Sequence, residues 1–131
     1  MAEIVKFSDK TIDYAKNPRN QGEIEAPTAV GEVSNPDCGD STKIYLKVEE
    51  GIIVDITFET FGCAAAVASS SMLTELVKGK TIEEAAAVTE QAVSDALGGL
   101  PDKKMHCSMV GVSALQKALN NYRNGVVDDE A

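Results

Sequence analysis

The chain has 131 residues, of which 44% are hydrophobic and 25% are charged, a composition typical of one globular domain with a modest core. Its formal net charge of −9 repels phosphate backbones, so nucleic acid is not an expected partner. No stretch resembles a membrane-spanning helix or a secretory signal. Three cysteines cannot all pair, and intracellular thiols are normally reduced. We therefore expect a single cytoplasmic domain over residues 1–131, with no membrane attachment.

The N-terminal part of the chain predicts one short helix followed by irregular backbone. Residues 9–16 have helical character, and the following Asn-Pro pair ends the helix. Residues 17–37 are rich in Asn, Pro and Gly, with a short strand predicted near 30–34. We expect residues 1–37 to form a helix and an arm that is partly mobile.

Two alternating stretches, 43–48 and 52–60, predict a β-hairpin with one buried face. Glu49-Glu50-Gly51 forms the predicted turn between them. The side chains expected to face the core are Ile44, Leu46, Val48, Val54, Ile56 and Phe58. A polar opposite face is typical of an antiparallel sheet.

After Gly62 the hydrophobic period becomes helical. Helices are predicted over about 63–77, from Thr81 with a capping box to Glu84, over about 90–97, and over about 107–122. The predicted class is α+β: a small antiparallel sheet of about three strands, with helices packed on its apolar face.

The three cysteines each fall at a predicted element boundary. Cys38 precedes the first hairpin strand, Cys63 follows the second, and Cys107 begins the last helix. The hairpin brings residues near 40 and 62 to one end, and the last helix must bring Cys107 there. Asp40 and His106 supply a possible fourth ligand beside three thiolates, a donor set suited to zinc or an iron–sulfur cluster. Helix N-termini favour thiolates, so we expect depressed pKa values at Cys63 and Cys107.

Interpretations of the same residues that involve no metal remain open at this point. Buried free cysteines often pack as small hydrophobic side chains. His106 by itself suits a surface or capping role, and Asp40 suits a turn cap. A cysteine hydrolase using Cys107 and His106 is disfavoured, because adjacent helical residues point about 100° apart. Lys104 is either solvated or helps to position sulfur.

Several motifs, in order along the chain, resemble those of the IscU/NifU-type iron–sulfur cluster assembly scaffolds. The matching stretches are Asn17-Pro18-Arg19-Asn20 with Gly22, Cys38-Gly39-Asp40, Phe58-Glu59-Thr60-Phe61-Gly62-Cys63, Ala66-Val67-Ala68-Ser69-Ser70-Ser71, Lys78-Gly79-Lys80-Thr81 and Lys104-Met105-His106-Cys107-Ser108. They cover nearly the whole chain, which makes the resemblance far more specific than any single motif.

The resemblance implies an IscU-like fold and a scaffold, not an enzyme, that builds a 2Fe–2S cluster and transfers it to apo-proteins. Cys38, Cys63 and Cys107 would be the thiolate ligands, with Asp40 or His106 as the fourth ligand or proton-handling neighbour. Implied partners are a cysteine desulfurase, an iron donor, an electron donor and apo iron–sulfur client proteins, with Cys107 as the persulfide acceptor. The alternative is a zinc-bound sulfur-acceptor module, since zinc can occupy the same site.

Two departures from the family pattern limit what carries over. Members served by a dedicated Hsp70-type chaperone have Leu-Pro-Pro-Val-Lys before the His-Cys pair, whereas this chain has Leu-Pro-Asp-Lys-Lys at 100–104. The added acid and lysine would disfavour an apolar peptide groove, which argues against chaperone dependence. Longer nitrogen-fixation relatives carry further domains, so the chain is either a stand-alone scaffold or an excised domain.

Overall fold

The computed structural model describes residues 9–35, 40–62, 64–98, 105–125 and 127. The elements in chain order are α1 (Asp9–Lys16), β1 (Ala29–Asn35), β2 (Asp40–Glu49), β3 (Ile52–Phe61), α2 (Ala64–Val77), α3 (Ile82–Ala86), α4 (Glu90–Ala96) and α5 (Met105–Arg123). Within these residues, none of the helices combines the length and the hydrophobicity needed to cross a bilayer.

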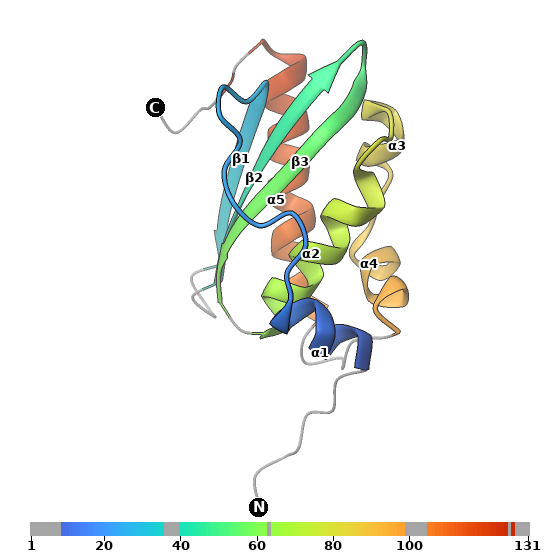
Figure 1. The fold of residues 1–131 in the computed structure, drawn as a ribbon. Helices are drawn as coiled ribbons and strands as arrows, with labels where there is room; N and C mark the ends of the chain where they lie inside the picture. Colours follow the sequence, from blue (N-terminus) through green and yellow to red (C-terminus); the bar gives the residue numbers. More distant parts are fainter. Residues whose placement is uncertain (1–8, 36–39, 63, 99–104, 126, 128–131) are drawn as a thin grey trace, which may run out of the picture.

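The three strands form one antiparallel sheet in the order β1-β2-β3. Helix α5 packs on β1 and β2, and α2 packs on β3 and on α5. Figure 1 shows these two helices side by side on one face of the sheet, with α3 and α4 beyond them. The predicted α+β class, with a three-stranded sheet and helices on one face, is confirmed.

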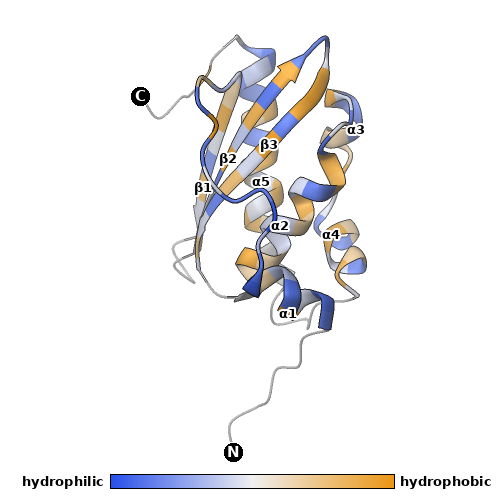
Figure 2. Cartoon of the chain, in the orientation of Figure 1, coloured by the Kyte–Doolittle hydropathy of each residue, from blue (hydrophilic) through white to orange (hydrophobic). Residues whose placement is uncertain are grey.

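The core lies between the sheet and α2 and α5, as the alternation along the strands predicts. Hydrophobic and hydrophilic residues alternate along β2 and β3 (Figure 2). The core-facing side chains of these strands, all at most 9% exposed, are Ile44, Leu46, Val48, Ile53, Ile56 and Phe58. Their burial against α2 and α5 is the main driving force for assembly of the two layers.

The prediction is wrong for one core residue: Val54 is 41% exposed, and Ile53 is fully buried instead. A β-bulge explains the difference. Lys47 pairs with Asp55 but Val48 pairs with Ile53, so Val54 is the extra residue on β3. An extra residue shifts the period-two alternation by one position, and everything between the bulge and the turn changes face.

The arm between α1 and β1 is attached to the sheet in its described part. The Phe58 amide donates to the Asn20 carbonyl at 3.0 Å, and the Gly22 amide donates to the Phe58 carbonyl at 2.9 Å. Figure 1 shows this segment crossing from α1 towards β1. The free edge of β3 is thereby paired at Phe58, which shortens the stretch open to pairing with another chain.

Candidate metal centre

One end of the sheet gathers the start of β2 and the ends of β1 and β3. Asn35 pairs with Asp40, and Ser41 pairs with Phe61. Cys38 belongs to the four-residue connection between the first pair, and Cys63 follows Phe61 by two residues. The sequence-based expectation that residues near 40 and 62 share one end is therefore confirmed for the backbone.

Helix α5 runs antiparallel to β1, which brings its first turn to this same end. The Asn121 Nδ2 donates to the Val30 carbonyl at 2.8 Å, and the Lys117 Nζ donates to the Glu32 carbonyl at 3.1 Å. Residues nearer to Asn35 on β1 therefore lie beside residues with lower numbers on α5. At about 1.5 Å per helical residue, twelve residues from Lys117 to Met105 span about 18 Å. Three strand residues span about 10 Å, so the first turn of α5 reaches the end of β1.

Helix α2 begins at the same end, because Ala64 follows Phe61 after only two residues. A hydrogen bond of 3.0 Å from Thr60 Oγ1 to Ser70 Oγ ties its second turn to the last part of β3. Two helix N-termini therefore meet the end of the sheet. Their unpaired N–H groups and positive dipole ends favour anions, including thiolates.

The predicted ligands are placed only as far as the described residues allow. Cys38, Cys63 and Lys104 lie outside them, as does the rest of the 100–104 stretch on which the chaperone argument depends. Asp40, His106 and Cys107 are placed by their backbone, while their side chains lie outside the described set. The ligand geometry and the expected thiol pKa values stay predictions.

Two predicted positions need correction. Asp40 is the first residue of β2, paired with Asn35, and not part of a turn before the strand. The last helix begins at Met105 instead of Cys107, so His106 and Cys107 both lie in its first turn. Cross-strand pairing extends β2, and neither change moves the residues away from this end of the sheet.

No alternative metal site competes within the part of the chain that the structure describes. There, no group of three or more His, Cys, Asp or Glu side chains is arranged to hold an ion. In the sequence, all three cysteines and the single histidine of the chain are within, or directly next to, the element ends described above.

A row of three hydroxyls, two buried and one half-buried, lies just inside this end and was missed by the sequence-based search for metal ligands. Thr42 Oγ1 and Thr60 Oγ1 are 3.1 Å apart, and Thr60 Oγ1 donates to Ser70 Oγ at 3.0 Å. The signal was present: Thr42 and Thr60 continue the core-facing alternation of Ile44 and Phe58. Ser69, Ser70 and Ser71 of α2 are all buried, which suits a role in packing.

The Asn17-Pro18-Arg19-Asn20 motif fastens the arm to α2. The Arg19 amide donates to Ser71 Oγ at 2.6 Å, and Asn20 Nδ2 donates to Thr74 Oγ1 at 3.0 Å. Arg19 also forms an ion pair of 2.7 Å with Asp13, which lowers the pKa of that carboxyl through the hydrogen bond. The motif thus has a structural role, because it holds the arm against α2.

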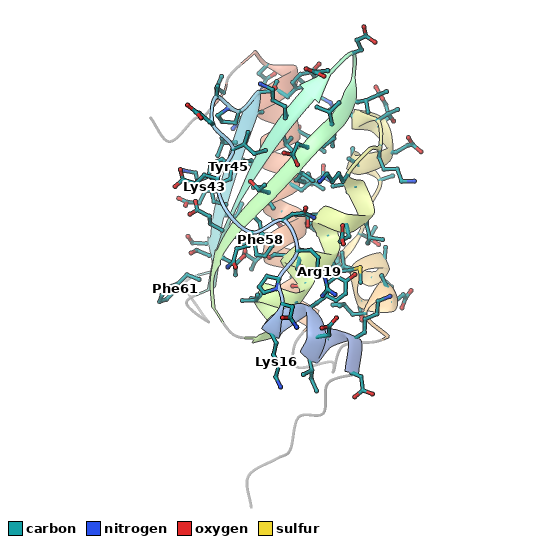
Figure 3. The ribbon with its side chains drawn as sticks, in the orientation of Figure 1. Lys16, Arg19, Lys43, Tyr45, Phe58 and Phe61 are labelled. Carbon is teal, nitrogen blue, oxygen red and sulfur yellow. The ribbon has the colours of Figure 1, made fainter. Side chains whose placement is uncertain are left out.

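The outer face of the sheet carries a buried phenol and, at its end, an exposed aromatic ring. Phe61 is 78% exposed, and Figure 3 shows it projecting outward. Tyr45 donates a hydrogen bond to Glu59, and Lys43 lies 5.2 Å from the centre of the Tyr45 ring. Burial, and then the neighbouring carboxylate, raise the pKa of Tyr45, so its hydroxyl stays a neutral donor.

Residues 6–128 match the model of the family described as NifU-like N terminal domain. An iron–sulfur cluster assembly scaffold protein IscU of Archaeoglobus fulgidus is 56% identical over 93% of this chain and 81% of its own length. A nitrogen fixation protein NifU of Nostoc is 46% identical over 89% of this chain but 42% of its own length. The crystal structure of a NifU-like protein (N-terminal) from Brucella abortus superposes with a TM-score of 0.75 at 22% identity, covering 89% of this chain and 94% of that one.

Proposed function

This chain belongs to the family of NifU-like N-terminal domains, and we propose on that basis that it is a scaffold on which an iron–sulfur cluster is assembled and then passed on. Relatives from Archaeoglobus fulgidus and Aquifex aeolicus, of which this chain covers most of the length, are named as iron–sulfur cluster assembly scaffold proteins, not as enzymes. The cluster is cargo in this proposal, since a scaffold must hold it and also release it.

One observation carries the proposal: the ends of β1, β2 and β3 and the starts of α2 and α5 meet at one end of the sheet. These are the backbone positions next to Cys38, Asp40, Cys63, His106 and Cys107. The meeting of these element ends supports the proposal that residues far apart in the chain bind one small cluster.

We assign the cluster to three thiolates, Cys38, Cys63 and Cys107, with Asp40 or His106 as the fourth ligand. Four thiolates would hold iron firmly. With one carboxylate or imidazole ligand in place of a thiolate, one iron is held more weakly, and the thiolate of a client protein can displace that ligand. A 2Fe–2S cluster needs four protein ligands, which matches this donor set.

Cys107 is the proposed acceptor of sulfur. Its thiolate attacks the terminal sulfur of a persulfide on a cysteine desulfurase, and the thiolate of the desulfurase leaves. The resulting persulfide on Cys107 then takes two electrons from an external reductant, which releases sulfide and regenerates the thiolate. Ferrous iron from an iron donor completes the cluster, and apo-proteins receive it.

Anaerobic reconstitution with ferrous iron, a cysteine desulfurase and cysteine tests the proposal. The expected result is visible absorbance of an iron–sulfur chromophore, which is lost when Cys38, Cys63 or Cys107 is replaced singly by Ser. Metal analysis of the same samples separates the alternative, because a zinc-bound sulfur-acceptor module would hold zinc and develop no chromophore. Full chromophore in all three variants would contradict the ligand assignment.

The role of Asp40 is tested by a matched pair of carboxylate substitutions. Asp40→Ala should slow release of the cluster to an iron chelator, because the variant lacks the carboxylate that is proposed to be the easily displaced ligand. Asp55→Ala is the control: Asp55 is also on the sheet but lies towards the opposite end and pairs with Lys78 at 3.4 Å. Faster release from Asp40→Ala than from the control would contradict the labile-ligand role.

A further inference from the structure

The hydroxyls of Thr42, Thr60 and Ser70 form a hydrogen-bonded row that crosses from the sheet to α2. Thr42 lies on β2, Thr60 on β3 and Ser70 on α2. Thr42 is 1% exposed, Ser70 is fully buried, and Thr60 between them is half-buried. The row is therefore a polar connection between the sheet and α2 whose two outer members are shielded from water.

The bonds have a defined direction. Thr60 Oγ1 donates its proton to Ser70 Oγ at 3.0 Å. A hydroxyl has one proton, so in the 3.1 Å contact Thr42 is the donor and Thr60 the acceptor. Each hydroxyl hydrogen bond is satisfied only within a narrow range of distance and angle, whereas apolar packing is non-directional. The row thus specifies how α2 sits on β2 and β3.

Each member of the row belongs to an element that also carries a proposed ligand. Thr42 lies two residues after Asp40 on β2. Thr60 lies three residues before Cys63, and Ser70 lies in the second turn of the helix that follows Cys63.

Helix α5 meets the row at a glycine. A Cβ atom at Gly111 would lie 3.4 Å from Ser70 Oγ, so the backbone of α5 passes close to this hydroxyl. Gly111 lies one helical turn after Cys107. The row therefore connects or touches the elements that carry, or directly follow, Asp40, Cys63 and Cys107 in the sequence.

We propose that Thr42, Thr60 and Ser70 are positioning residues that set the separation of the proposed ligand-bearing ends and so control how firmly the cluster is held. This inference rests on the proposed scaffold function. None of the three touches the cluster; they act through β2, β3 and α2. Without the row, α2 is free to shift along the sheet, and the ligand spacing changes with it.

The central test compares Thr60→Val, which removes the hydroxyl at nearly constant shape, with Thr60→Ser, which keeps it. Thr74→Val is the matched control, since Thr74 is a fully buried hydroxyl of the same helix that bonds to the Ser71 carbonyl and to Asn20, away from the row. The readouts are the visible circular dichroism spectrum of the reconstituted cluster and its rate of loss to an iron chelator.

We expect Thr60→Val to lose the cluster about tenfold faster than wild type and to alter its spectrum, as removal of an outer hydrogen bond does in metal sites. Thr60→Ser should restore both properties. Thr74→Val should leave both unchanged, even at an equal loss of melting temperature. If Thr60→Val and Thr74→Val behave alike, the positioning role is overturned. Ser70→Ala is the second variant, because alanine favours a helix and gives a folded protein if Thr60→Val does not.

A readout on the protein without cluster separates this inference from the proposed function. Amide hydrogen exchange in residues 64–70 should be faster in Thr60→Val than in Thr74→Val, because the first turns of α2 lose their attachment to β3. Wild-type protein that takes up no cluster would contradict the scaffold function, while the exchange rates would still decide whether the row positions α2. Equal exchange in the two variants overturns the positioning role.

Discussion

The two ends of the β2–β3 hairpin are closed in different ways. At the turn end, Glu50 and Gly51 adopt positive φ angles of 54° and 76°, and two adjacent residues reverse the chain. At the other end, five element termini from separate parts of the sequence meet, and no local turn joins β3 to α5. The turn end is thus a product of local geometry, whereas the proposed metal centre depends on how α2 and α5 pack.

This difference predicts that substitutions inside the helix–sheet interface alter the metal centre without being near it. The row of Thr42, Thr60 and Ser70 is one such interface feature, and the contact of Gly31 with α5 is another. Substitutions at the turn end should lower stability and leave cluster loading intact. The following predictions run from the largest expected effect to the smallest.

Gly31→Ala should have the largest effect, because β1 and α5 touch through their backbones at this residue. A Cβ atom at Gly31 would lie 2.4 Å from both the Ala114 carbonyl oxygen and the Ala118 amide nitrogen. Neither backbone atom can move alone, so we expect a loss of about 3 kcal/mol in the free energy of unfolding. Urea denaturation measures it, and cluster loading should fall as well, since α5 is displaced.

Gly111→Ala is the control for this substitution. Its nearest contact would be an ordinary 3.4 Å to the Ser70 hydroxyl. Alanine is the better helix former by about 1 kcal/mol, so the variant should be as stable as wild type or more so. A loss of stability equal to that of Gly31→Ala would show that the close approach of β1 and α5 is not the cause.

Tyr45→Phe tests the outer face, between the two ends. Loss of the hydrogen bond to Glu59 should lower stability by about 1.5 kcal/mol at neutral pH. The pKa of Tyr45 is raised above 10.0 in the folded state, so the stability it contributes is complete below that pH and is lost as the pH rises further. Urea titrations from pH 8 to pH 11 should show this loss in wild type and a smaller one in Tyr45→Phe. Parallel pH curves would contradict the assignment.

Gly51→Ala probes the turn end. A positive φ of 76° is strained for alanine, and we expect a cost of about 1 kcal/mol. Open space surrounds the position, so no clash adds to this cost. The cluster loaded per protein should equal that of wild type. A defect in loading as large as that of Gly31→Ala would contradict the independence of the two ends.

Glu84→Gln should have the smallest effect and also concerns the turn end, where the Ile82 amide donates to the Gly51 carbonyl at 3.0 Å. Hydrogen bonds with the Thr81 backbone and side chain lower the pKa of Glu84 below 4.5. A lowered pKa contributes stability above the unfolded value, and this is lost as the pH falls through the folded value. Thermal melts of wild type should therefore converge on those of Glu84→Gln below pH 4, and a constant difference would contradict this.

Much of the secondary structure could be predicted from the sequence, because its signals are local. Alternation located β2 and β3, and the capping box of Thr81 and Glu84 is formed by two hydrogen bonds of 3.1 Å. The burial of Ile53 in place of Val54 could not be predicted, because a bulge depends on pairing with the neighbouring strand. Tyr45 is similar: it lies on the polar face by alternation, yet it is buried.

For the metal centre, the sequence by itself determined which side chains can bind a metal and that each lies at an element boundary. Only the tertiary structure decided that α5 runs antiparallel to β1 with its first turn at the end of β1, and that three hydroxyls connect β2, β3 and α2. Local patterns report backbone preferences over a few residues. The direction and depth of helix packing depend instead on contacts between distant residues, such as the approach of Gly31 to Ala118.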